Sequence, residues 1–385
     1  MTVQIRDPFV AADPAHPVFM LRAPDHAVSG KSIHRRLPPG GTGTLGARVR
    51  DFFAAAPDGI PMLVGAIPFD PAAPDFLFQP RALDRQVEFP PALAGRPLLV
   101  GTVASIPSRE DFKGAVQEAL RLLGDPASDL RKVVLSRTLR LSLEEKPDVL
   151  DLAARLASDP NVAVFVTSLS EDTGEKARLM VGATPELLVS RRGRKIVSHP
   201  LAGSARRSRD DAVDRAAAAS LQDSEKDRRE HALVVECILD CLAPHCRSLS
   251  APPRPALQAT AAMWHLGTRI EGEIADAGMS AAALAALLHP TPAVGGFPRP
   301  SALAAIRRLE AHDRGFYAGA LGWVDAHGDG SWYVTLRCAE LQANEACLYA
   351  GVGIVSGSDP SSEAAETCAK LQTMLRAMGL CDSRL

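Results

Sequence analysis

Hydrophobic and polar residues alternate along several short segments of this chain, and a two-residue period predicts β-strands. A continuous apolar run at 62–67, which ends at Pro68, also predicts a strand. Segments of this kind predict strands at 132–143, 162–169, 179–190 with an interruption at Pro185, 319–325, 332–341 and 347–355.

Other segments place apolar residues three to four positions apart, which predicts helices. In 109–123, Phe112, Val116 and Leu120 share one face, and the following Gly-Asp-Pro ends the helix. Further helices are predicted at 211–241, 281–288, 301–309 and 361–378. Runs of strands and helices in this order predict an α/β fold of the α+β kind, with a largely antiparallel sheet.

One glycine-rich segment, 41–46, matches the G-x-G-x-x-G pattern of dinucleotide-binding proteins. That motif requires a strand immediately before it. Here Arg-Arg-Leu-Pro-Pro-Gly precedes it, and proline is excluded from a central strand. We therefore predict a loop, with 38–43 at its centre, and no dinucleotide site.

The formal net charge of −2 and the absence of a basic block argue against a nucleic-acid or membrane-surface protein. No apolar run is long enough to span a bilayer, and the N-terminal segment lacks the apolar core of a secretion signal. Seven cysteines occur without a paired framework. We expect a cytoplasmic protein with reduced thiols and a small-molecule ligand.

Four possible metal ligands, Cys237, Cys241, His245 and Cys246, lie close together in the sequence. Their spacing fits no standard zinc motif, and the first two share one face of a predicted helix. We expect buried structural thiols here.

Two predicted helices carry acidic residues at helical spacing. Asp227 and Glu230 share a face, as do Glu363, Glu366 and Lys370. Surface ion pairs would explain both patterns, although a Glu–Lys pair at i,i+4 contributes only about 0.2–0.5 kcal/mol. Alternatively, the two helices share one hard cation through carboxylate oxygens. Spacing alone does not decide between these interpretations.

Two charged residues occupy unusual positions at strand ends. Lys132 opens a strand, where lysine is ordinarily exposed, but a lysine facing a closed polar pocket could act as a base. Glu186 follows Pro185 at a strand break and is either a turn carboxylate or a general acid. Gly203, Gly351 and Gly353 lie beside predicted strands and either allow close approach to a ligand or form simple bulges.

Seven motifs follow one another along the chain: KVVLSR (132–137), GATPELL (182–188), PLAGSARR (200–207), SEKDRREH (224–231), LLHPTPAVGGFP (287–298), VTLRCAEL (334–341) and AGVGIV with SEAAETCAK (350–355 and 362–370). In these motifs and their order, the chain resembles the chorismate-utilising enzymes over about 95–385. Residues 1–94 would form the N-terminal part of one integrated unit, and 95–385 the chorismate-binding catalytic region. Residues before about 60 match poorly.

The resemblance is to the isochorismate synthases of siderophore pathways, whose fold packs two α/β halves with inner sheets and outer helices. It implies a monomer that uses Mg²⁺, with Glu230 and Glu366 as ligands supported by Asp227 and Glu363. It also implies a set of substrate-binding residues: Gly203, Ser204, His265, Ala293, Leu336, Arg337, Tyr349, Gly351 and Lys370.

The implied reaction adds water at C2 of chorismate and removes the C4 hydroxyl. Lys132 would accept a proton from water, and Glu186 would donate one to the leaving hydroxyl. Salicylate synthase, which also eliminates pyruvate, is the alternative within the family. The small residue Ala293, beside Leu336 and Tyr349, favours release of isochorismate. A catalytically silent chorismate-binding relative is the alternative outside enzymes.

Overall fold

The structure is a computed structural model that describes residues 17–55, 59–87, 89, 98–172 and 176–380 of the 385-residue chain. Residues 1–16, which include most of the segment examined for a secretion signal, lie outside these residues, and so does the proposed boundary at residue 94.

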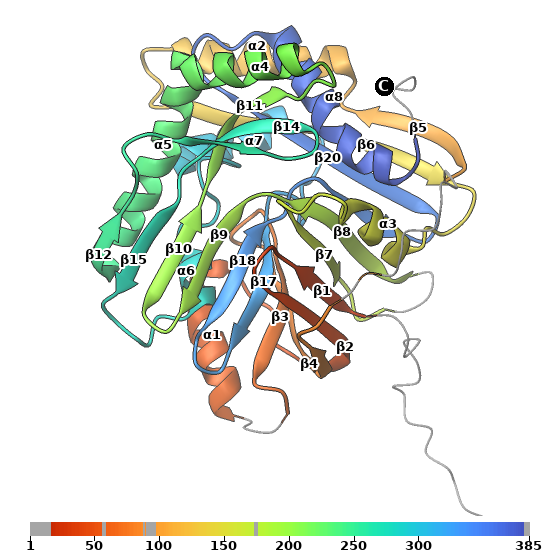
Figure 1. Cartoon of the computed structure of the whole chain (residues 1–385), viewed down its shortest axis with the longest axis vertical. Coiled ribbons are helices and arrows are strands. Elements are labelled where there is room, and N and C mark those ends of the chain that lie inside the picture. The colour runs from red at the N-terminus through yellow and green to blue at the C-terminus, as the bar shows by residue number, and fades with distance from the viewer. Residues whose placement is uncertain (1–16, 56–58, 88, 90–97, 173–175, 381–385) are drawn as a thin grey trace, which may run out of the picture.

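Antiparallel pairing joins 17 strands into one extended sheet (Figure 1). These strands are β1 (Phe19–Arg22), β2 (Ala27–Arg36), β3 (Met62–Ile67), β4 (Phe76–Asp84), β5 (Val100–Ile106), β6 (Lys132–Leu143), β7 (Ala163–Ser168), β8 (Arg178–Thr184), β9 (Leu187–Arg192), β10 (Lys195–His199), β12 (Cys246–Ser250), β15 (Ile270–Ile274), β16 (Gly296–Phe297), β17 (Ala320–Asp325), β18 (Gly330–Val334), β19 (Cys338–Gln342) and β20 (Glu345–Ile354). A second sheet contains β11 (Leu201–Arg206), β14 (Met263–Gly267) and β13 (Ala256–Ala259). The antiparallel α+β architecture confirms the predicted fold class.

Helices lie on the outside of the sheets, and α2, α4 and α8 gather at one end of the molecule (Figure 1). Their bounds are α1 (Thr42–Ala55), α2 (Arg109–Gly124), α3 (Val149–Leu156), α4 (Asp211–Asp223), α5 (Glu225–Leu242), α6 (Ala281–Leu288), α7 (Arg299–Leu309) and α8 (Pro360–Ala377). Among the described residues, no helix combines the length and apolar character needed to cross a membrane.

Elements with a strong local pattern match their predictions. β3 and β6 have the predicted bounds, and α6 coincides with the predicted helix. α2 begins where Ser108 caps it, because the Ser108 side chain accepts a hydrogen bond from the amide of Asp111 at 3.1 Å. Its buried residues Phe112 and Val116 belong to the predicted apolar face.

Three predictions need correction. The helix over 211–241 is two helices, because Ser224 ends α4 and caps α5. The strand over 332–341 is broken into β18 and β19, and Arg337 within the break has a φ of +48°. The glycine-rich segment is a loop only up to Gly41, since α1 starts at Thr42. No strand enters this segment directly, so it lacks the context of a dinucleotide-binding turn.

The main hydrophobic core joins both ends of the chain. Phe19, Phe78 and Trp332 are fully buried in one cluster, which packs the N-terminal strands against those near the C-terminus. A second cluster lies beneath α3 and α8, with Leu152 and Met374 among its buried members. Burial of this apolar surface supplies most of the driving force for folding.

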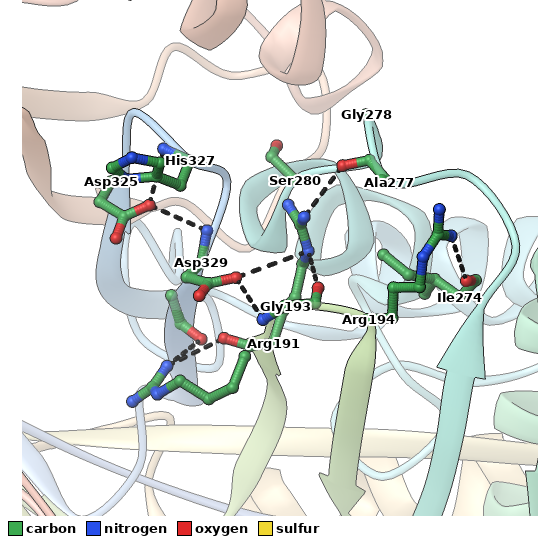
Figure 2. A network of polar contacts seen from close by, with 12 residues as sticks. Arg191, Gly193, Arg194, Ile274, Ala277, Gly278, Ser280, Asp325, His327 and Asp329 are labelled. Carbon is green, nitrogen blue, oxygen red and sulfur yellow. Dashed lines mark hydrogen bonds and ion pairs between the residues drawn. The ribbon is translucent and has the colours of Figure 1, made fainter.

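A buried arginine connects three loops away from the cavity described below (Figure 2). Nε of Arg191 donates to the carbonyl of Gly193 at 2.7 Å, and Nη2 donates to that of Ala277 at 2.9 Å. The Asp329 carboxylate accepts from the Gly193 amide at 2.8 Å and lies 3.7 Å from Nε of Arg191. These contacts fix the β9–β10 and β17–β18 turns against residues 275–280, which gives Arg191 a structural role.

Candidate active site

A cavity lies where the small sheet, the first turns of α5 and α8, and strands β6 and β20 meet. The predicted site residues that line it are Glu186, Gly203, Ser204, Asp227, Glu230, His265, Ala293, Leu336, Arg337, Gly351, Glu363, Glu366 and Lys370. Two others, Lys132 and Tyr349, are not among the lining residues.

The first acidic pair is positioned by the start of α5. The Ser224 hydroxyl accepts a hydrogen bond from the Asp227 amide at 3.2 Å and so fixes the first turn of the helix. Asp227 and Glu230 then point into the cavity, and Glu230 is only 8% exposed. The pair therefore does not lie on a solvated surface face, which was the simpler interpretation of the pattern.

The second acidic pair is positioned by α8, whose N-terminus Asp359 caps by accepting from the Ser362 amide at 2.8 Å. Glu363 accepts a hydrogen bond from Lys226 at 2.8 Å. Glu366 lies 2.7 Å from the Lys370 ammonium. These four side chains all line the cavity, so two helices distant in sequence present charged groups to one space.

The clustered carboxylates affect one another's pKa values. Burial, followed by the nearby Glu230 carboxylate, raises the pKa of Asp227. Burial and the charge of Glu366 raise the pKa of Glu363. For Glu366, burial acts in the raising direction, but Lys370 and Ser204 outweigh it and the pKa is lowered. Closely spaced carboxylates repel, and a bound cation would relieve that repulsion.

The donor set fits a hard divalent cation. Carboxylate oxygens are the ligands that Mg²⁺ prefers, and such sites often use only one or two protein carboxylates. In the described part of the chain, no three His, Cys, Asp or Glu side chains form a ready-made metal cage. The protein could therefore supply Glu230 and Glu366, with the remaining positions left to water and ligand.

Lys132, at the start of β6, is fully buried. Its Nζ lies 2.9 Å from Oε1 of Glu230, but the direction of this contact does not suit a hydrogen bond, and Nζ has none within the described residues. A Cβ added at Gly353 would fall 2.1 Å from the same Glu230 oxygen and 3.0 Å from Cε of Lys132. Only glycine at 353 leaves room for this pair.

Glu186 lies in the short break between β8 and β9 that Pro185 produces, and it is 3% exposed. Its backbone amide donates to the Thr184 hydroxyl at 3.3 Å. Burial raises the pKa of Glu186 to about 8, against the opposing charges of Lys132 and Arg337. The carboxyl is thus mainly protonated at neutral pH and able to donate a proton.

Cationic groups occupy another wall. Arg337 lines the cavity and makes no hydrogen bond or ion pair with any residue that the structure describes. Burial lowers the pKa of its guanidinium, while nearby groups that include Glu366 and Glu186 act in the raising direction. The Lys370 ammonium donates to the carbonyl of Gly351 at 2.9 Å. An unpartnered guanidinium facing a cavity is well suited to bind a ligand carboxylate in a bidentate manner.

The small sheet supplies the opposite wall. Gly203 has a φ of +81° within a bulge of β11, a conformation that favours glycine. Next to it, the Ser204 hydroxyl donates to Glu366 at 2.6 Å. His265 of β14 lies opposite Ser204 of β11 in the sheet. Nε2 of His265 is buried without a hydrogen-bond partner among the described residues. Burial holds the pKa of His265 well below its ordinary value, so the ring is neutral.

Sequence patterns did not identify every polar residue that lines the cavity, and Lys226 and Tyr317 are the examples. Lys226 stands within the SEKD motif but received no role, and Tyr317 lies in a loop without any periodic pattern. Tyr349 was expected to line the cavity with Ala293 and Leu336. Instead its ring stacks on Tyr317, with ring centroids 4.9 Å apart, and Tyr317 forms the wall.

The cysteines near the end of α5 are not part of this cavity. Cys237, Cys241 and Cys246 are free and half-buried, which corrects the prediction that these thiols are buried. They contribute no metal-binding group to the described part of the chain.

Comparison with known proteins identifies relatives across most of the chain. A family model described as "Chorismate binding enzyme" matches residues 93–379. The isochorismate synthase DhbC of Bacillus subtilis (strain 168) is 40% identical over 378 residues, covering 94% of each chain. The vibriobactin-specific isochorismate synthase of Vibrio cholerae serotype O1 is 43% identical over 326 residues, covering 83% of this chain and 80% of the relative.

Solved structures agree with this relationship. The crystal structure of DhbC from Bacillus anthracis superposes with a TM-score of 0.88 and 37% identity, over 95% of this chain and 97% of that one. The family match, the relatives and the shared architecture lead to one conclusion: this chain belongs to the family of chorismate-binding enzymes.

Proposed function

We propose that this chain is an isochorismate synthase, an isomerase that converts chorismate to isochorismate. Relatives of that activity cover most of its length. The observation that carries the proposal is the pairing in one site of a mainly protonated carboxyl, Glu186, with a fully buried lysine, Lys132. Addition of water and loss of a hydroxyl group require an acid and a base of this kind.

In the proposed reaction, Lys132 accepts a proton as water bonds to C2 of the ring. The ring double bonds shift, and Glu186 donates a proton to the C4 hydroxyl, which leaves as water.

Binding of the substrate uses its two carboxylates. We assign the enolpyruvyl carboxylate to Arg337 and Lys370, with the backbone at Gly351, because these groups form the cationic wall. The ring carboxylate faces the backbone at Gly203 and Ser204. Glu230 and Glu366, supported by Asp227 and Glu363, would hold Mg²⁺. When bound, Mg²⁺ would neutralise the charge of a substrate carboxylate.

Activity should fall as pH rises through about 8. Glu186 must be protonated to act as an acid, and its raised pKa of about 8 keeps it so at neutral pH. Above that value kcat/KM should fall about tenfold per pH unit, the slope for loss of one proton. A pH–rate profile tests this, and the falling limb should disappear from the residual activity of Glu186→Gln. A wild-type profile that stays level to about pH 9.5 would contradict the assignment.

The product distinguishes isochorismate synthase from salicylate synthase. Salicylate formation requires pyruvate to leave, and the intermediate must be retained while the enolpyruvyl group lies over C2. Ala293 and Leu336 offer no hydrogen bonds to hold it there. We therefore expect isochorismate in equilibrium with chorismate and little salicylate.

Chromatography of a reaction with chorismate and Mg²⁺ tests the activity, while coupled lactate dehydrogenase reports pyruvate. Stoichiometric pyruvate and salicylate would move the proposal to salicylate synthase. Tight chorismate binding without any product would favour a catalytically silent relative. The proposed place in a siderophore pathway rests only on relatives such as the vibriobactin-specific enzyme.

A further inference from the structure

Two neighbouring hollows lie on one side of the active-site cavity. The inner hollow shares Pro185 and Arg337 with the cavity. The outer hollow shares Ala261, Ala262 and Arg376 with the inner one. The two hollows therefore follow one another toward the wall of the cavity that contains Arg337.

Arginines dominate these two hollows. The outer hollow is lined by Arg206, Arg207, Arg209 and Arg376, and no acidic side chain accompanies them there. Arg207 is already paired with Asp214, at 2.9 Å. We call the three others, Arg206, Arg209 and Arg376, the arginine vestibule. All three are exposed, and none has an ion pair or hydrogen bond within the part of the chain that the structure describes.

Composition and helix dipoles do not account for this cluster. The chain has 43 basic and 45 acidic residues, so its surface is not basic in general. Arg376 lies in the last turn of α8, where a positive charge interacts favourably with the helix dipole. Arg209, however, immediately precedes Asp210, the N-cap of α4, where the dipole disfavours positive charge.

A doubly negative substrate must approach a cavity that already contains several carboxylates. Chorismate carries two carboxylates, so Asp227, Glu363 and their neighbours would repel it before it binds. The outer hollow has no acidic lining residue, and the inner hollow has three arginines, Arg155, Arg337 and Arg376, against one acidic residue, Asp159. On this side the substrate therefore meets mainly attractive charge before it reaches Arg337. Clefts lined by charge of one sign raise association rates about 10- to 10³-fold.

We propose that the arginine vestibule is the approach route of the dianionic substrate, and that Arg206, Arg209 and Arg376 accelerate its capture by electrostatic attraction. This inference rests on the proposed function, which supplies the identity of the anion. The attraction acts over distance and is therefore screened by salt, with a Debye length of about 10 Å at 0.1 M. Salt dependence consequently separates it from a packing role.

The test compares two triple variants that remove the same charge. Arg206→Gln/Arg209→Gln/Arg376→Gln neutralises the vestibule, and Arg50→Gln/Arg247→Gln/Arg269→Gln neutralises three exposed arginines elsewhere. We measure kcat/KM for chorismate from about 20 to about 400 mM NaCl, a range over which screening becomes strong. The vestibule variant should lose about tenfold in kcat/KM at low salt and approach wild type at high salt. The control variant should follow wild type throughout.

A vestibule variant with wild-type kcat/KM and wild-type salt dependence would overturn the proposal, and so would a loss that persists unchanged at high salt. If the triple variant unfolds, the single variants Arg376→Gln and Arg376→Lys provide the test. Only the lysine variant keeps the positive charge, so it should retain the wild-type kcat/KM for chorismate. Chromatography of the same reactions identifies the product. If no isochorismate forms, the proposed function fails, and the vestibule is then tested by the salt dependence of chorismate association, followed through tryptophan fluorescence.

Discussion

Replacing either Glu230 or Glu366 by Gln should abolish turnover while leaving the fold intact. Each change removes a charged oxygen from the cluster that α5 and α8 form, and Gln keeps the shape of the side chain. A neutral amide is a much weaker ligand for a hard cation than a carboxylate. Activity should therefore become undetectable in both variants, and wild-type activity should be lost in EDTA and restored by Mg²⁺.

A second readout separates loss of metal from loss of the Lys132–Glu230 contact. Binding of Mg²⁺ to the folded state should raise the Tm of the wild type, since a ligand of the native state stabilises it. That increase should be absent in Glu230→Gln and Glu366→Gln but present in Glu236→Gln, which changes an exposed carboxylate on the same helix. Full activity in EDTA would exclude the Mg²⁺ assignment.

The acid and base variants should show the next largest effects. Lys132→Ala and Glu186→Gln should each lower kcat by about 10²-fold or more, the usual contribution of a positioned proton donor or acceptor. Chorismate should still bind, because Arg337 and Lys370, the groups proposed to bind its carboxylates, are unchanged. Steady-state kinetics give kcat, and fluorescence titration gives the affinity.

Control variants come from residues of the same type at exposed strand starts. Lys195 opens β10 as Lys132 opens β6, and Glu345 opens β20, but both are exposed. Lys195→Ala and Glu345→Gln should retain wild-type kcat. Near-wild-type turnover in Lys132→Ala would remove the basis for a water-adding mechanism, even if the metal dependence is as expected.

Local patterns in the sequence determined the elements that carry the site. The alternation at 132–143 predicted β6, and Pro185 correctly indicated the break that contains Glu186. Helical spacing placed Asp227 with Glu230, and Glu363 with Glu366, on common faces. Period and capping chemistry are properties of neighbouring residues, which is why they can be read without a structure. Weak or short patterns, as in α1 and β11–β15, were not recognised.

The tertiary structure decided how these faces meet. Periodicity does not reveal which distant segment covers a face, so burial of Lys132 against Glu230, 98 positions later, required the packed fold. For the same reason only the structure placed Tyr317 between Tyr349 and the cavity. The raised pKa of Glu186 and the convergence of Arg206, Arg209 and Arg376 likewise depend on burial and distance in space, and these quantities exist only once the chain is folded.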